Sequence, residues 1–153
     1  MQPPPETTDR TMTDTITWVD GHIELVDQTA LPHEEVVLRV TTVSDLVAAI
    51  RRLSVRGAPA LGVAGAYGVA LAVATVPDAE LADAIESIRT ARPTAVNLAR
   101  MTDRVAARLA DGFGAVLDEA HTVYREEIAA SIAMGSRGAD IIDELLEDVG
   151  GRA

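Results

Sequence analysis

Cysteine is absent from this chain of 153 residues. Disulfides, thiolate metal sites and a cysteine nucleophile are therefore excluded within it. Aromatic residues make up only 3% of the sequence, which leaves too few rings for a surface that stacks nucleic-acid bases. The three histidines, at positions 22, 33 and 121, lack the spacing of metal ligands. These absences narrow the chemistry that the chain's own side chains can perform.

Basic residues are also scarce, with 13 Lys and Arg against 24 Asp and Glu and a net charge of −11. A sequence pI near 4.5 argues against nucleic acid as a partner, because neutralising phosphates requires a basic face. It argues equally against an anionic membrane surface. The length favours one domain with a substantial core.

One segment, residues 58–76, carries no charge and is long enough to span a membrane. Its composition is mostly Ala, Gly and Val, and glycines at 62, 65 and 68 suit close packing against other helices. A buried core helix is therefore favoured over a membrane span. Residues 1–14 contain three consecutive prolines and no apolar core of a signal peptide. We predict a disordered tail there and a cytoplasmic location.

Hydrophobic periodicity predicts a small sheet followed by helices. Asp20-Gly21 is a hairpin turn signal between two alternating runs, Ile16–Val19 and His22–Val26. A third β-like run covers residues 35–40. The helical patterns follow at residues 43–53, with Thr42 or Ser44 as a cap, and at 58–76, 78–90, from Pro93 to about 111, and 117–149.

The predicted fold class is α+β, a three-stranded antiparallel sheet followed by a helical bundle. The order of elements contains no βαβ alternation, so no Rossmann-type sheet is expected in this chain. Two glycines, Gly135 and Gly138, fall inside the last helical pattern and predict a kink or a tight crossing.

The most informative motif is Val-Arg-Gly-Ala-Pro-Ala-Leu-Gly at residues 55–62. Gly57 allows backbone to approach a ligand, and Pro59 suits the first turn of a helix. The free amides of a helix start together with the Arg56 guanidinium make a site for phosphate or carboxylate. The alternative is a surface arginine that caps the preceding helix.

A second arginine, Arg92, directly precedes Pro93 and repeats the pattern of an arginine at a proline-opened helix start. Two such starts that converge would bind one anion between them, whereas a lone Arg92 would be a surface residue.

Two further groups of polar residues have ordinary structural explanations. His121 with Glu126 and Glu127 lacks the helical offsets of a metal site, so a solvated face is favoured. The segment 27–29, Asp-Gln-Thr, either touches a ligand or forms a turn.

Taken together, these motifs resemble the N-terminal part of the methylthioribose-1-phosphate isomerase family. This family is related to ribose-1,5-bisphosphate isomerase and to the alpha, beta and delta subunits of translation initiation factor 2B. The resemblance extends from about residue 16 to 149 and is carried by residues 25–32, 55–68, 91–98 and 126–139. The run Arg-Pro-Thr-Ala-Val-Asn-Leu at 92–98 favours the isomerase over the initiation-factor subunits.

The resemblance implies an aldose–ketose isomerase of methionine salvage, with a sugar phosphate as substrate. It implies that Arg56, Gly57, Ala58 and Arg92 bind substrate, and that no metal or organic cofactor is used.

Members of this family continue into a Rossmann-like domain that supplies a catalytic cysteine and aspartate. The resemblance therefore implies that the catalytic residues lie beyond Ala153, the last residue of this sequence. We expect residues 15–153 to form a substrate-binding half without catalytic residues, whose partner is a homodimer mate or the missing C-terminal half. The alternatives are a non-catalytic interaction module and a ribose-1,5-bisphosphate isomerase fragment.

Overall fold

The computed structural model describes residues 15–150, with side chains as far as Glu147. Two parts of the predicted organisation lie outside the described residues: the tail at residues 1–14, and the end of the predicted substrate-binding half at Ala153. The expectation that catalytic residues follow Ala153 is therefore not tested by the structure and stays a prediction.

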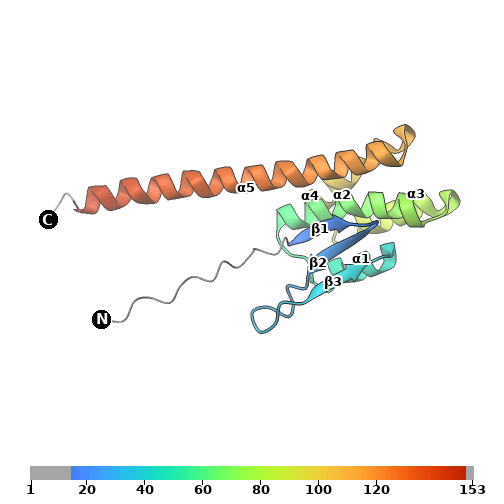
Figure 1. The fold of residues 1–153 in the computed structure, drawn as a ribbon, viewed down its shortest axis with the longest axis horizontal. Coiled ribbons are helices and arrows are strands. Elements are labelled where there is room, and N and C mark those ends of the chain that lie inside the picture. Colours follow the sequence, from blue (N-terminus) through green and yellow to red (C-terminus); the bar gives the residue numbers. More distant parts are fainter. Residues whose placement is uncertain (1–14, 151–153) are drawn as a thin grey trace.

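The described chain forms a small antiparallel sheet and then helices, confirming the α+β class (Figure 1). The elements are β1 (Ile16–Val19), β2 (His22–Val26), β3 (Val37–Val40), α1 (Val43–Arg51), α2 (Ala58–Thr75), α3 (Asp78–Arg89), α4 (Val96–Ala106), the 3₁₀ turn η1 (Leu109–Asp111) and α5 (Phe113–Gly150).

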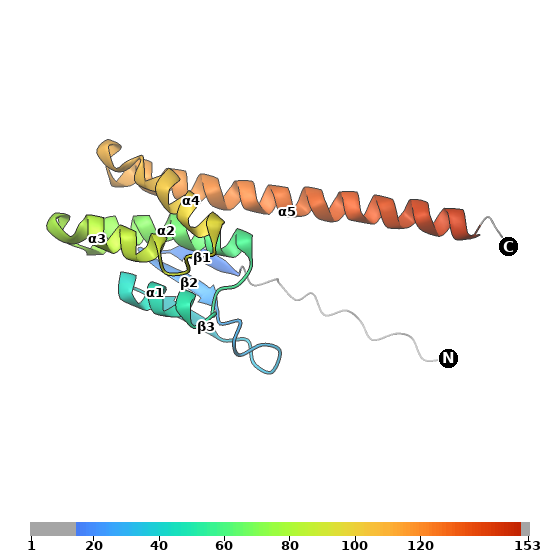
Figure 2. The same ribbon diagram turned by 180° about the vertical axis from the view of Figure 1, so that it is seen from behind.

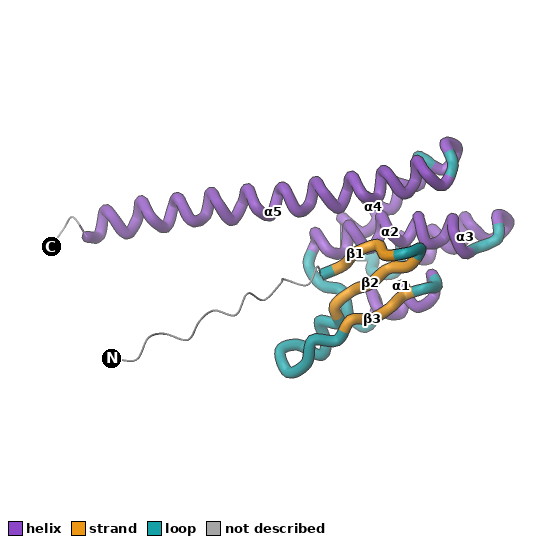
Figure 3. Tube along the Cα trace, viewed as in Figure 1, coloured by secondary structure: helices purple, strands orange, loops and turns teal. Residues whose placement is uncertain are grey.

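The sheet has the order β1-β2-β3, and both pairs are antiparallel. The predicted hairpin at Asp20-Gly21 is confirmed. The third strand is shorter than predicted and begins at Val37, because Val26 and Val37 form the last pair and the Asp27 N–H then closes the loop on the Val36 carbonyl at 2.7 Å. This loop separates β2 from β3 at one end of the sheet (Figure 3).

The first helix begins as predicted, because the Thr42 hydroxyl accepts a hydrogen bond from the Asp45 N–H at 3.2 Å. It ends at Arg51, earlier than the predicted residue 53, since Leu53 takes a φ of 70°, which is incompatible with a right-handed helix.

Helix α2 is the centre of the fold. It packs against α1, α3, α4, α5, β1 and β2, and every residue from Leu61 to Ala72 is buried. It is long and apolar enough to cross a membrane, but 67% of it is buried inside the protein. A helix that is apolar on all sides needs partners on all sides, and here other elements of the chain supply them. The predicted core helix is confirmed.

The glycines of α2 allow neighbouring helices to approach closely. A Cβ atom on Gly65 would lie 2.6 Å from Thr102 Oγ1 and 2.7 Å from the Leu98 carbonyl oxygen, both on α4. A Cβ on Gly68 would lie 2.8 Å from Leu46 of α1. Real Cβ contacts are longer, so the packing role predicted for these glycines is confirmed.

The fourth helix differs from the prediction at both ends. It begins at Val96 rather than at Pro93, because residues 92–95 form a turn in which the Ala95 N–H bonds to the Arg92 carbonyl at 2.9 Å. Proline suits the second position of such a turn. The helix ends at Ala106, and only residues 109–111 of the remaining predicted segment are helical, as η1.

The last helix begins at Phe113, earlier than predicted, and is unbroken to Gly150. Gly135 and Gly138 do not interrupt it, so the predicted kink is wrong, because one glycine costs a helix only about 1 kcal/mol. The alternative, a tight crossing, is also absent from the described chain, since no residue outside the helix lies within 4 Å of a Cβ built on either glycine. The first part of α5 packs on α2 and α4. Its C-terminal half extends beyond every other described element, as both views show (Figures 1 and 2).

Candidate anion-binding site

Helix α2 starts at a backbone conformation that favours glycine. Gly57 is the N-cap and has φ 89° and ψ 140°, a region that L side chains rarely adopt. Glycine has no side-chain oxygen, so the helix start carries no side-chain cap. Pro59 lacks an N–H group, and the amides of Ala58 and Ala60 have no partner within the helix. The positive end of the helix dipole therefore faces the space in front of the helix start and favours an anion there.

Arg56 is held by backbone of a distant loop. Its guanidinium Nη2 donates to the Gln28 carbonyl at 2.8 Å. The Gln28 N–H in turn donates to the Ser54 carbonyl at 3.1 Å, and the Gln28 side chain reaches the Arg56 carbonyl at 3.5 Å. Arg56 therefore bonds to the segment after β2 and not to the end of α1, where the alternative interpretation placed it.

The segment 27–29 forms the turn that positions Gln28. The Asp27 carboxylate accepts hydrogen bonds from the Thr29 hydroxyl at 2.7 Å and from the Thr29 N–H at 3.0 Å. The Thr29 hydroxyl, together with Ser54 and the positive charge of Arg52, lowers the pKa of Asp27 below its ordinary value. Asp27 is thus ionised at neutral pH and fixes the loop that supports Arg56.

The four residues predicted to bind substrate all lie on one cavity of about 470 Å³. Arg56, Gly57 and Ala58 reach it from the start of α2, and Arg92 reaches it from the turn before α4. The remaining lining residues are Leu53, Leu61, Thr94, Ala95, Val96 and Asn97. Whether the four bind substrate stays a prediction, but the structure brings them together across 36 residues of sequence.

Arg92 arrives at this cavity differently from the prediction. It does not stand at a proline-opened helix start, because Pro93 occupies the turn and α4 begins at Val96. The turn nevertheless puts half-buried Arg92 and exposed Thr94 on the same wall as the start of α4. Within the described chain, only the start of α2 combines an arginine with proline in the first turn of a helix.

The cavity is positively charged although the protein is acidic. Two arginines and no aspartate or glutamate are found among its described lining residues, in a chain with 24 acidic residues. Two guanidiniums and uncapped helix amides favour a doubly charged anion such as a phosphate. Sequence reasoning missed Thr94 and Asn97, polar residues that also line the cavity. Both belong to the segment 91–98, so the motif itself was the signal.

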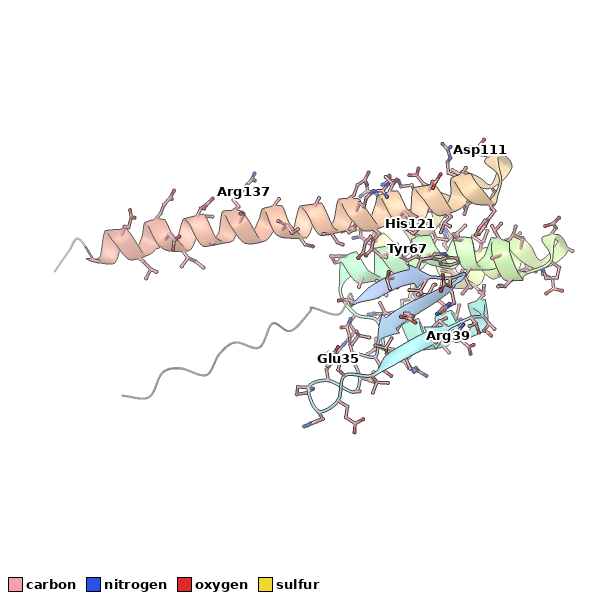
Figure 4. The ribbon with its side chains drawn as sticks, in the orientation of Figure 1. Glu35, Arg39, Tyr67, Asp111, His121 and Arg137 are labelled. Atoms are coloured by element: carbon pink, nitrogen blue, oxygen red, sulfur yellow. The ribbon has the colours of Figure 1, made fainter. Side chains whose placement is uncertain are left out.

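The other candidates have structural roles. His121 Nδ1 lies 3.1 Å from the Tyr67 hydroxyl, where α5 crosses α2 (Figure 4). Glu126 accepts two hydrogen bonds from Arg104, at 2.6 and 3.1 Å, and this contact lowers the pKa of its carboxyl group. Among the described residues, no group of three or more His, Asp and Glu is arranged to hold a metal ion.

The fold and the cavity define a small α+β domain in which two arginines and an uncapped helix start line the same cavity. The chain belongs to the initiation factor 2 subunit family, whose model matches residues 54–147.

Relatives in this family include several isomerases. The chain is 41% identical over 136 residues to a probable bifunctional methylthioribose-1-phosphate isomerase/methylthioribulose-1-phosphate dehydratase of Nocardia farcinica, a match that covers 85% of this chain and 25% of that protein. It is 41% identical over 142 residues to a 5-deoxyribose 1-phosphate isomerase of Moorella thermoacetica, a match that covers 83% of this chain and 40% of that protein.

Solved structures show the same fold. The 5-methylthioribose 1-phosphate isomerase of Pyrococcus horikoshii matches with a TM-score of 0.77 and 27% identity, over 86% of this chain and 41% of that one. The delta subunit of translation initiation factor eIF-2B from A. fulgidus matches with a TM-score of 0.64 and 35% identity, over 77% of this chain and 37% of that one. The chain therefore spans well under half the length of these relatives.

Proposed function

We propose that this chain is the sugar-phosphate-binding part of a methylthioribose-1-phosphate isomerase. The observation that carries the proposal is the cavity on which Arg56, Gly57, Ala58 and Arg92 meet. The names of relatives over about 85% of the chain support the substrate class. The phosphate would lie between the two guanidiniums, with the amides of Ala58 and Ala60 directed at its oxygens.

In this proposal the chain binds substrate but does not complete the reaction. Conversion of an aldose phosphate to a ketose phosphate requires groups that move a hydrogen between adjacent carbons, and no residue pair of that kind is found among the described residues that line the cavity. Holding the phosphate alone does not lower the barrier unless the transition state is bound better than the substrate.

The catalytic groups would come from a second, C-terminal domain that follows Ala153 in the complete enzyme or is supplied as a separate chain. The complete enzyme would work in the cytoplasm without a cofactor. The partner of the chain would be that domain or a homodimer mate.

The test is calorimetric titration of residues 1–153 with methylthioribose 1-phosphate. Arg56→Gln and Arg92→Gln should each weaken binding by roughly 1.5–3 kcal/mol, about 10- to 150-fold, because each removes a charge-assisted contact. Arg137→Gln is the matched control, since it removes the same charge from an exposed position on the distant part of α5 (Figure 4). Equal affinity in all three variants would refute the shared site. Turnover by the isolated chain, in a preparation free of host isomerase, would refute the proposal that the catalytic groups lie outside this chain.

A second candidate function is a non-catalytic module like the initiation-factor subunits. The observation in its favour is the 35% identity to the eIF-2B delta subunit, which is higher than the 27% identity to the isomerase structure. The same titration separates the two candidates, because an interaction module has no need of a sugar phosphate. A third candidate is a ribose-1,5-bisphosphate isomerase fragment. Titration with ribose 1,5-bisphosphate as a competitor separates it from the first candidate.

A further inference from the structure

Leu53 occupies a backbone position where glycine is the usual residue. Helix α1 ends in a Schellman motif, in which the Ser54 N–H donates to the Ala49 carbonyl at 2.9 Å and the Leu53 N–H donates to the Ile50 carbonyl at 3.3 Å. The motif puts Leu53 at a φ of 70°, in the left-handed region. Its side chain is 42% exposed and lines the anion-binding cavity. Neither backbone conformation nor core packing therefore accounts for a leucine here.

Val96 is a second apolar residue on this cavity that the core does not explain. It is the first residue of α4 and is 74% exposed, the largest fraction among the exposed large hydrophobic residues of the described chain. The buried face of α4 consists of Leu98, Met101, Thr102 and Val105. Val96 precedes Leu98 by two residues, about 200° around the helix, and so lies on the opposite side. Its β-branched side chain is also unfavourable in a helix.

The cavity that these two residues line combines a cationic part with an apolar part. Arg56, Arg92 and the uncapped start of α2 supply the positive charge. Leu53 and Val96 belong to the apolar part, which Leu61 and Ala95 complete. A volume of about 470 Å³ falls in the range of small-molecule sites, where apolar surface surrounds a few polar groups. The lining is therefore that of a site for a small amphipathic anion.

A ligand that matches this lining has one charged group and one uncharged apolar group. The arginines neutralise a single phosphate. A second charged group placed against Leu53 and Val96 would lose its hydration without gaining a partner, whereas a methyl or thioether group would be stabilised by leaving water. We infer that Leu53 and Val96 select sugar 1-phosphates whose 5-position carries an apolar substituent. This inference rests on the proposed function, which assigns the phosphate to Arg56 and Arg92.

The competing ligand is a sugar bisphosphate. Helix α4 starts at Ala95 without a side-chain cap, as α2 does at Gly57, and each helix start favours an anion. Arg56 and Arg92 would then bind one phosphate each. The apolar part of the cavity argues against this arrangement, because the first residue of α4 presents a valine side chain to the cavity and not a hydrogen-bond donor.

Calorimetric titration of residues 1–153 with three sugar phosphates tests the selectivity. Methylthioribose 1-phosphate should bind roughly tenfold more tightly than ribose 1-phosphate, the effect of about two methylene-sized groups leaving water. Ribose 1,5-bisphosphate should bind no more tightly than ribose 1-phosphate. Equal affinity for the first two sugars, or tightest binding of the bisphosphate, would overturn the inference while leaving the phosphate site intact. Binding of none of the three would refute the proposed function, and the inference with it.

Leu53→Asn separates a ligand contact from a structural role. Asparagine tolerates the left-handed backbone conformation, so the end of α1 is kept, which circular dichroism verifies, while the apolar side chain is lost. The preference for methylthioribose 1-phosphate over ribose 1-phosphate should fall at least about threefold, with the affinity for ribose 1-phosphate unchanged. Val96→Thr, which keeps the shape of the side chain and adds a hydroxyl group, should have the same effect.

Leu145→Asn is the matched control. It removes the same side chain from a position that is 60% exposed on the C-terminal half of α5, outside the cavity, and should leave the preference unchanged. A preference that survives both Leu53→Asn and Val96→Thr would overturn the inference. An equal loss of affinity for both sugars in these variants would also overturn it, because the two residues would then support the site without contacting the 5-substituent.

Discussion

Helix α2 and the C-terminal half of α5 are both long and rich in apolar residues, yet one is enclosed and the other is open. Around α2 the apolar residues cover the whole circumference, and four helices and two strands pack on it. On α5 they form one side, and every residue from Ile128 to Glu147 is exposed. The difference fits the rule that a helix that is apolar around its whole circumference is surrounded by protein, whereas a helix with one apolar side needs a partner on that side alone.

The largest effect should come from crowding the enclosed helix. Gly65→Ala is expected to lower the free energy of unfolding by about 1–3 kcal/mol, because the new methyl group would overlap a hydroxyl and a carbonyl oxygen of α4. Urea denaturation followed by circular dichroism measures the change. An unchanged denaturation midpoint would mean that α4 can move away from α2 at no cost.

The start of α2 should be sensitive for a different reason. Gly57→Val creates no clash at Cβ, since no described atom outside the neighbouring residues lies within 4 Å of it, but a φ of 89° strains a β-branched residue by about 1–3 kcal/mol. We expect the peptide to rotate and relieve part of this strain, which misdirects the Ala58 amide. Affinity for a sugar phosphate should fall at least about tenfold, more than the loss in stability. Unaltered affinity in this variant would contradict the role of Gly57.

Acid should weaken the loop that supports Arg56. The pKa of Asp27 is lowered in the folded protein, so its contribution to stability is present above the unfolded pKa near 4 and is lost as the pH falls through the folded value. Asp27→Asn should cost about 1 kcal/mol at pH 7 and less at pH 3. Thermal melts of both proteins across this range measure the difference. A difference in stability between the two proteins that grows as the pH falls would show that ionised Asp27 does not stabilise the fold.

The smallest effect should be a gain on the open helix. Gly138→Ala is expected to stabilise the protein by about 0.5–1 kcal/mol, because alanine is the better helix former and no described atom outside the helix itself lies within 4 Å of the new methyl group. The same substitution therefore has opposite signs in the two helices. A loss of stability at position 138, measured by urea denaturation, would show that this half-helix is packed against other residues.

The sequence was a good guide where one physical signal dominated. Apolar periodicity located every α-helix of the described chain, and Asp20-Gly21 located the hairpin. It was a poor guide at Pro93, because proline suits both the first turn of a helix and the second position of a turn, and only the Ala95–Arg92 hydrogen bond distinguishes them. At Gly135 and Gly138 the sequence predicted a kink that the helix does not have, since a cost of about 1 kcal/mol each does not break a long helix.

The candidate site was likewise predictable from the sequence only in part. Arg56, Gly57 and Ala58 were identifiable because they are adjacent and stand at a helix start. Their meeting with Arg92 depends on the contact between α2 and α4, and periodicity carries no information on which helices are neighbours. The bond from Arg56 to the Gln28 carbonyl was likewise invisible, because the acceptor is main chain and leaves no trace in residue identity.

The root of α5 is fastened by side chains while its far end is not. Arg104 bonds to Glu119 at 2.7 Å and to Glu126 at 2.6 Å, and the His121 ring bonds to Tyr67. The helix beyond this root extends about 30 Å, at 1.5 Å per residue. A tilt of about 10° at this root would displace the end of the described helix by roughly 5 Å. The three contacts, together with the core packing of Val116, Ala120 and Val123, therefore fix the direction of the exposed half-helix.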